Sequence, residues 1–276
     1  MKADLHFHPS FFSRGIKPPI TERKIPSLAE IERKALNSKL DLLTITSYSR
    51  VEHIDKRWDA YMQELKTASE QFPNEFVSPQ TNKLPQAIRF TAKTLQGDYP
   101  IYIIHGQEIQ TNKGDVNVLF AEKRVPVENS KGDFYWIVDV AKDSGENVLI
   151  GLNQLSNFHL PLMKIKELYE HGKIDFVESW NSMDFKKNNQ YAQRAEKETQ
   201  IPGIAVSDGH RLEDMARAFI TTDEHYLTTG TYSELARFIK LKLETRAYTN
   251  VKGKTNLVGK ILYTTKLIHA FLNHKL

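Results

Sequence analysis

An acidic residue and two histidines alternate near the start of the sequence, in the segment Asp4-Leu5-His6-Phe7-His8. Because side chains alternate along a strand, Asp4, His6 and His8 would point to the same side of a strand. Three polar groups on one side of a buried strand cost free energy unless they face water or a metal ion. Two imidazoles at positions i and i+2 can bind one cation from the end of a strand. The segment is therefore a candidate metal site that needs further ligands from elsewhere in the chain.

Two later strand ends offer such ligands. The apolar run 201–206 leads into Asp208 and His210, which the same alternation places on one side, and the apolar run 99–106 is followed by Glu108. Active sites of parallel α/β folds lie where strands end and loops begin. Imidazoles and carboxylates together make a mixed nitrogen and oxygen ligand set that suits Zn²⁺, Mn²⁺ or Fe²⁺.

The rest of the sequence supplies the elements that position these residues. Short, nearly continuous apolar runs alternate with amphipathic stretches, a pattern typical of strands buried on both faces. We predict strands at 3–7, 40–46, 99–106, 116–120, 147–152, 174–179 and 201–207. Strands that alternate with helices indicate an α/β fold built on a parallel sheet, open or closed.

Capping-box patterns mark two of the predicted helices. Ser27 is followed by Glu30, and Thr231 by Glu234, at the spacing that lets both side chains cap a helix N-terminus. We predict helices at 28–38, 184–199, 235–243 and 256–276, and two helices within 52–96 joined by a loop near 79–85.

Five segments, taken in order, resemble the motifs of PHP-domain proteins, the polymerase and histidinol phosphatase superfamily. They read ADLHFHPSFFSRG, LDLLTITSYS, HGQEIQTNKGDVNVL, DFVESWNS and AVSDGH. The order and spacing of five motifs are far more specific than any one motif. The resemblance implies a distorted TIM-like (β/α)7 barrel and a metal-dependent hydrolase of phosphate esters. Members of this superfamily usually hold two or three metals.

The resemblance also implies a ligand set for one metal. In the family pattern the first metal is bound by both histidines of the opening motif, the Glu of the third and the Asp of the last. The matching positions here are His6, His8, Glu108 and Asp208, and all four residues are of the expected type. We therefore expect one divalent transition metal (Zn, Mn or Fe) per chain.

The ligands of the second family metal are replaced. The histidine expected after Glu108 is Asn117, and the expected His-Pro motif is Asn153-Gln154. His105 stands three residues before Glu108, and we interpret it as a core histidine. A trinuclear mechanism of the family type is therefore not expected.

The third family metal keeps only His210. Arg14 stands where an acidic ligand is expected, and Tyr48 stands where a histidine is expected. An Arg side chain binds phosphate oxygens through two parallel hydrogen bonds, and a tyrosine hydroxyl donates one more. We assign Arg14, Tyr48 and His210 as candidate catalytic residues, with His210 as general acid or substrate contact. In the alternative interpretation, Arg14 and Tyr48 only fill space left by lost ligands.

Composition and charge bound the remaining choices. The chain of 276 residues is 40% hydrophobic and 26% charged, an ordinary globular balance, and it contains no cysteine. That excludes disulfides, thiolate metal sites and cysteine nucleophiles. Residues 237–276 hold nine basic residues and one acid, so their net charge is +8 and that of the remainder is −4. We expect a barrel over 1–250 and a basic helix over 251–276, packed on the barrel or extending from it.

Three functions compete at this point. The leading hypothesis is a hydrolase that acts on a phosphorylated substrate. The alternatives are a catalytically impaired barrel that serves as a binding or regulatory module, and a nuclease-like phosphodiesterase whose basic C-terminus contacts nucleic acid. No apolar run approaches the roughly 20 residues that span a bilayer, and the N-terminal segment lacks the apolar core of a signal peptide. We therefore expect a cytoplasmic protein without membrane contact, and the sequence leaves its oligomeric state open.

Overall fold

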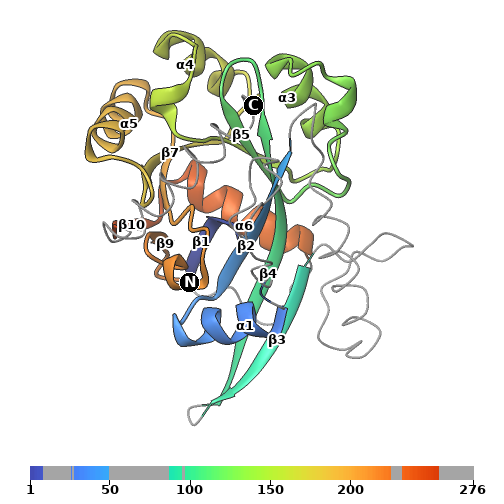
Figure 1. Cartoon of the computed structure of the whole chain (residues 1–276), viewed down its shortest axis with the longest axis vertical. Helices are drawn as coiled ribbons and strands as arrows, with labels where there is room; N and C mark the ends of the chain where they lie inside the picture. The colour runs from blue at the N-terminus through green and yellow to red at the C-terminus, as the bar shows by residue number, and fades with distance from the viewer. Residues whose placement is uncertain (9–25, 27, 50–86, 95–96, 225–231, 255–276) are drawn as a thin grey trace, which may run out of the picture.

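The computed structural model describes residues 1–8, 26, 28–49, 87–94, 97–224 and 232–254. Its strands form one mixed sheet that curves into a nearly closed barrel, with strand order β10-β9-β1-β2-β4-β5-β6-β7-β8 and with β3 paired to β4 as a branch (Figure 1). The strands are β1 (Lys2–Phe7), β2 (Leu42–Ser49), β3 (Ala87–Thr94), β4 (Gly97–Gln110), β5 (Asp115–Leu119), β6 (Leu149–Leu152), β7 (Phe176–Asn181), β8 (Gly203–Val206), β9 (Phe219–Thr221) and β10 (Thr249–Val251). The α/β barrel expected from the sequence is confirmed.

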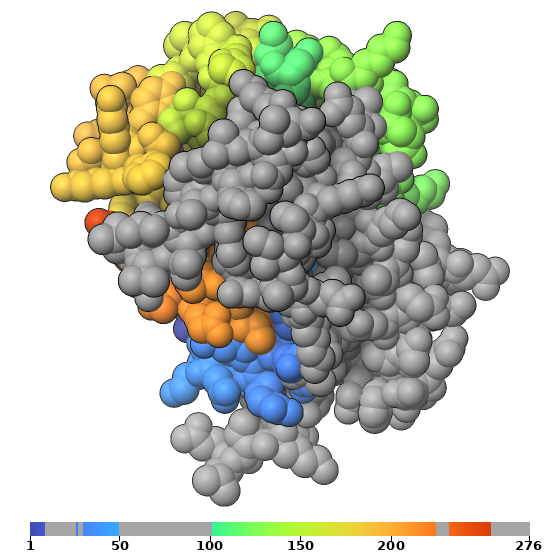
Figure 2. All heavy atoms as spheres, viewed as in Figure 1, coloured from blue at the N-terminus to red at the C-terminus, as the bar shows by residue number. Residues whose placement is uncertain are grey.

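Helices connect and cover these strands. They are α1 (Leu28–Asn37), α3 (Phe134–Lys142), α4 (Leu162–Glu170), α5 (Lys186–Thr199) and α6 (Tyr232–Glu244), with the short 3-10 segments η2 (Val127–Asn129), η3 (Leu155–Asn157) and η4 (Leu212–Asp214). The helices predicted at 28–38, 184–199 and 235–243 are thus confirmed. In the space-filling view, α3, α4 and α5 form the upper surface and α1 lies below them (Figure 2). No described helix is both long enough and apolar enough to span a membrane.

The sheet changes direction at its centre. β1, β2 and β4 are parallel neighbours, and so are β6, β7 and β8, but β5 lies antiparallel between β4 and β6. The reversal follows from the short connection between Gln110 and Asp115, which suits a hairpin and is too short for a crossover helix. As a result Asn117 of β5 lies directly opposite Glu108 of β4.

The barrel closes where β8 meets β1. The Asp208 N–H donates to the His6 carbonyl at 2.8 Å, and the His8 N–H donates to the Gly209 carbonyl at 2.8 Å. The bond from His8 to Gly209 belongs to an isolated parallel bridge between Phe7 and Gly209. The two ends of the open sheet are thus joined at the level of the histidines.

One apolar cluster fills one end of the barrel interior. It brings together residues of strands on opposite sides, such as Leu5 of β1, Tyr102 of β4 and Phe176 of β7, and it includes Leu235 and Ile239 of α6. Helix α6 therefore covers the end of the barrel that this apolar cluster fills. Two outer clusters lie under the other helices, one beneath α3, α4 and α5 and one beneath α1. The interior at the opposite end is left for polar side chains.

One helix prediction is wrong within the described residues. Residues 87–94 belong to a predicted helical stretch, but they form β3, which pairs with β4 in an antiparallel ladder. The reason is visible in the pattern, because apolar Ile88, Phe90 and Ala92 alternate with polar residues at the period of a strand. The other residues predicted as helices within 52–86, and the helix at 256–276, lie outside the described residues.

Candidate metal centre

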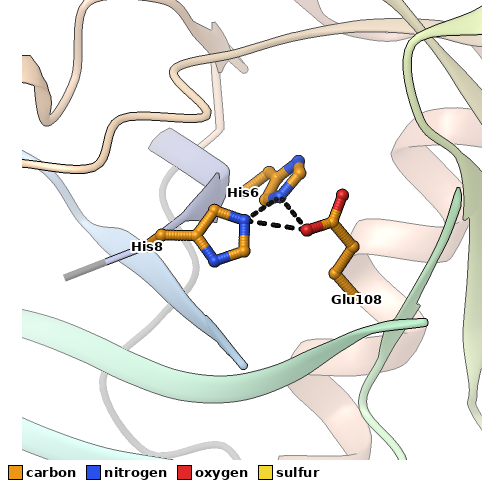
Figure 3. Close-up of side chains that lie close together, drawn as sticks. All are labelled: His6, His8 and Glu108. Atoms are coloured by element: carbon orange, nitrogen blue, oxygen red, sulfur yellow. Dashed lines mark hydrogen bonds and ion pairs between the residues drawn. The ribbon is translucent and has the colours of Figure 1, made fainter. Parts of the chain in front are cut away.

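The predicted metal ligands come together at one end of the barrel. His6 lies in β1 and His8 directly follows it, Glu108 lies near the end of β4, and Asp208 follows β8. All four are buried. Figure 3 shows the two imidazoles, both from the end of β1, and the Glu108 carboxylate of β4 pointing toward one another. The structure therefore gathers the residues that the sequence singled out.

The distances among the four side chains match one small cation. His6 Nε2 lies 2.9 Å from His8 Nε2, and His8 Nε2 lies 3.0 Å from Glu108 Oε2. His6 Nε2 lies 3.9 Å from Glu108 Oε2, and Asp208 Oδ1 lies 3.6 Å from each imidazole. Ligand atoms bound tetrahedrally at the usual zinc distances are about 3.4 Å apart. The observed spread brackets that value. His6, His8 and Glu108 form one group that could hold a metal ion, and His8, Asp208 and His210 form another that shares His8 with it.

The hydrogen bonds behind the two histidines aim their lone pairs into the centre. His8 Nδ1 lies 2.9 Å from the Thr46 carbonyl, which can only accept, so this nitrogen carries the proton. His6 Nδ1 lies 2.5 Å from Glu178 Oε1 and donates to it in the same way. In the neutral tautomers both Nε2 lone pairs then face each other and the carboxylates. Positive charge between them, from a proton shared by the two Nε2 atoms or from a metal ion, removes this repulsion, so the donor set fits a divalent metal.

Electrostatics at the centre point in the same direction. Burial opposes a charge on His6, but the carboxylates of Glu178, Asp208 and Glu108 outweigh it and raise the pKa of His6 to about 10. Burial likewise opposes ionisation of Glu108, yet the hydrogen bond and charge of His8 hold its pKa below the usual range. The pocket therefore favours positive charge, and a metal ion held by His6 would take the place of a proton on its Nε2.

Four amide side chains surround the carboxylates, and we call Asn117, Asn153, Gln154 and Asn181 the amide set. Each donates a hydrogen bond to a carboxylate of the centre: Asn153 to Glu108 at 2.9 Å, Gln154 to Asp208 at 3.1 Å, Asn117 to Glu178 at 3.1 Å, and Asn181 to both Asp208 at 2.9 Å and Glu178 at 3.1 Å. In the sequence, Asn117, Asn153 and Gln154 stand out only as replacements of family ligands, and Glu178 and Asn181 only as part of the fourth motif. Their hydrogen bonds to the centre were not predicted.

The backbone is strained at two of these positions. Gln154 has φ 44° and Asp208 has φ 45°, left-handed values that non-glycine residues rarely adopt. The two residues follow β6 and β8, and the side chain of Gln154 reaches Asp208 from there. Six other described non-glycine residues, away from the centre, also have positive φ, so the significance of these two lies in the contact between their side chains.

The candidate catalytic residues differ in how they are placed. The ring of His210 stacks on that of His8 at 4.8 Å, and its Nε2 lies 3.6 Å from Asp208 Oδ1. Burial, aided by the charge of His8, lowers the pKa of His210 to about 3, so it is neutral at physiological pH. Tyr48 is buried in β2 and is the register partner of Glu108 on the parallel strand β4. Arg14 lies outside the described residues.

Comparisons with known proteins rest on structure alone. No protein-family model matches the chain, and no curated protein matches it. The solved structure of PsfC from Pseudomonas syringae is 16% identical over 98% of this chain and 97% of its own, with a TM-score of 0.58. A two-domain protein from Bacteroides vulgatus, described as containing a predicted PHP-like metal-dependent phosphoesterase, is 17% identical over 91% of this chain and 64% of its own, with a TM-score of 0.55. The chain thus has the PHP-type barrel fold that its five motifs led us to expect.

Proposed function

We propose that this protein is a metal-dependent hydrolase of phosphate esters that binds one divalent cation through His6, His8, Glu108 and Asp208. The observation that carries the proposal is the convergence of two imidazole lone pairs and two carboxylates within 2.9–3.9 Å, with both tautomers set by buried acceptors. Scattered polar residues would not show matched orienting partners behind each ligand.

A divalent cation at such a site supplies positive charge that polarises a phosphoryl oxygen and lowers the pKa of a nearby water molecule. The protein contributes orientation and a dry surrounding. Glu178 and the Thr46 carbonyl hold the two imidazoles by their Nδ1 atoms. The buried carboxylates of Glu108 and Asp208 keep one oxygen each toward the imidazoles.

The remaining candidate residues act on the phosphate in this proposal. His210 is neutral, so it serves as a hydrogen-bonding contact for the substrate, and a role as general acid requires it to gain a proton first. Register partners on parallel strands project to the same face of a sheet, which supports Tyr48 as a hydrogen-bond donor near Glu108. Arg14 completes the proposed phosphate contacts from its place in the opening motif.

A second candidate is a binding or regulatory module that holds metal and phosphate without turnover. The amide set favours it, because amides occupy positions where the family pattern has further ligands. A phosphodiesterase acting on nucleic acid is the third candidate. Its basic segment lies mostly outside the described residues.

One experiment separates these candidates. Metal content is measured by mass spectrometry on protein purified without added metal. Hydrolysis of p-nitrophenyl phosphate, bis-p-nitrophenyl phosphate and a single-stranded oligonucleotide is then assayed with Mn²⁺ or Zn²⁺. We expect about one metal per chain and hydrolysis of an ester, both lost in His6→Ala. The control His171→Ala changes an exposed histidine at the end of α4 and keeps both.

Each outcome decides between candidates. Hydrolysis of the diester or the oligonucleotide, without the monoester, favours the phosphodiesterase. Metal and phosphate binding without any hydrolysis favours the module. A wild-type chain that holds no metal overturns the proposal.

A further inference from the structure

The Glu108 and Asp208 carboxylates each turn one oxygen toward the imidazoles and the other toward amide donors. Glu108 turns Oε2 toward His8 at 3.0 Å and receives the Asn153 amide on Oε1 at 2.9 Å. Asp208 turns Oδ1 toward both imidazoles and receives amides of Gln154 and Asn181 on Oδ2. One oxygen of each carboxylate therefore faces the candidate cation, and the other already has a donor.

The orientation of these amides follows from chemistry. Asn153 is 1% exposed and Asn117 is 0% exposed, so neither can turn toward solvent. An amide oxygen placed against Glu108 Oε1 or Glu178 Oε1 would oppose two acceptors, whereas the observed N–H group donates. An amide nitrogen has no lone pair to give to a metal. The N–H of Asn153 therefore occupies Glu108 Oε1, the oxygen on the side away from the imidazoles, and keeps a cation from binding to it.

We infer that Asn153, assisted by Asn117, takes the place of a second cation and restricts the centre to one metal ion. The inference rests on the proposed function, since it concerns how many cations that site holds. The N–H group of Asn153 places a partial positive charge against Glu108 Oε1, where a second cation would place at least a full one. Asn117 does the same for Glu178, which in turn holds His6. Both asparagines are positioning residues that act through the carboxylates.

The oxygens of the two asparagine amides could themselves bind a cation. Within the described residues, Asn117 Oδ1 and Asn153 Oδ1 are buried and have no hydrogen-bond partner. Such oxygens can ligate hard cations such as Mg²⁺ or Mn²⁺. These amide oxygens are neutral, however, and the nearby Glu108 Oε1 already accepts a hydrogen bond from Asn153. A charged site with two imidazoles lies next to them, so the first cation binds there.

The test replaces the N–H donor by an oxygen of the same size. In Asn153→Asp the introduced carboxylate faces Glu108 Oε1, and the repulsion between them is relieved by a cation. We expect wild-type protein dialysed against Mn²⁺ to hold one ion, and Asn153→Asp to hold two, with an exchange-coupled electron paramagnetic resonance signal. Asn147→Asp is the matched control, because it adds the same charge just before the other end of β6, where the Asn147 side chain donates to Ser233 at 2.7 Å. It should hold one ion.

A second variant guards against a folding defect in the first. Asn153→His introduces a neutral ligand with no like charge, and it should also raise the stoichiometry to two. One ion in wild type and one in both variants overturns the inference but leaves the proposed function intact. Two ions in wild type overturn it as well, because a second cation then binds despite the asparagines, either through their amide oxygens or at His8, Asp208 and His210. No ion in wild type overturns the proposed function together with the inference.

Discussion

Glu178 illustrates how one residue can set the state of a metal site without touching the metal. It is fully buried, and it accepts from His6 Nδ1 at 2.5 Å and from the amides of Asn117 and Asn181. Burial raises the pKa of Glu178, whereas the charge of His6 lowers it less strongly. The carboxylate and the imidazole therefore depend on each other, and a change in Glu178 should reach the metal through His6.

Replacing Glu178 by glutamine tests this dependence. The amide oxygen of glutamine can still accept from His6 Nδ1, so the tautomer is kept, but the negative charge that makes His6 a stronger ligand is lost. We expect Glu178→Gln to weaken metal binding about 10–100-fold, the usual range for such orienting partners, measured by competition with a chromophoric chelator. Glu167→Gln, a change in an exposed carboxylate on α4, is the control. Equal affinity in both variants would show that Glu178 has only a structural role.

The sequence predicts a site residue when the neighbouring residues along the chain form a recognisable pattern. His6, His8, Glu108 and Asp208 are predictable because each follows or ends an apolar run, and strand ends collect at one edge of the fold. The partners of those residues are not. The contact between Glu178 and His6 joins positions 172 residues apart, and it exists only because the barrel brings β7 and β1 to the same interior. Spacing along the chain carries no sign of that meeting.

Strands were more predictable than their directions. The apolar runs gave β1, β2, β4, β5, β6, β7 and β8, since burial on both faces leaves a strong pattern. The antiparallel placement of β5 was not anticipated, although the four residues between Gln110 and Asp115 leave room only for a turn. The short strand β9 pairs with β1 over two residues and with β10 over three, too few to show a period.

His105 is a buried histidine on the outer face of β4, and it contacts the neighbouring strand β2. His105 Nε2 lies 2.9 Å from Ser47 Oγ of β2, away from the metal centre, and His105 is 4% exposed. The sequence interpretation of His105 as a core histidine agrees with this placement. Burial lowers its pKa from 6.5 to about 3, so the folded protein keeps His105 uncharged between β2 and β4.

Acid should therefore loosen this strand pair. Between pH 6.5 and about 3 the unfolded chain binds a proton at His105 and the folded chain does not. The free energy of unfolding then falls as the pH falls, by up to about 1.4 kcal/mol per pH unit from this residue. Urea unfolding of His105→Gln, followed from pH 7 to pH 4, should show a shallower decline than wild type. Parallel declines would mean that His105 is protonated in the folded state or has access to water.

At the scale of the whole molecule, the candidate metal lies across the seam that closes the barrel. Among the described residues, two backbone hydrogen bonds and two bonds from Ser207, to the Asp4 carboxylate and the His6 carbonyl, connect β1 to the segment after β8, whereas β2 and β4 pair over eight residues. His6 and His8 lie on one side of the seam and Asp208 lies on the other. A cation bound by all three would tie the two ends of the sheet together, so metal binding and barrel closure should be linked.

Removing the metal should therefore destabilise the protein first at this seam. A ligand present at 100 times its dissociation constant stabilises the folded state by about 2.7 kcal/mol, which corresponds to a fall in Tm of about 5 °C when a chelator removes it. Hydrogen exchange should quicken at the Asp208 and His8 amides, whose bonds span the seam, and stay slow in the β2–β4 ladder. If chelation strips a measured equivalent of metal and leaves both Tm and seam exchange unchanged, the cation does not bridge β1 and β8. If exchange quickens equally in the β2–β4 ladder, the metal stabilises the barrel as a whole, and the seam is not its weakest point.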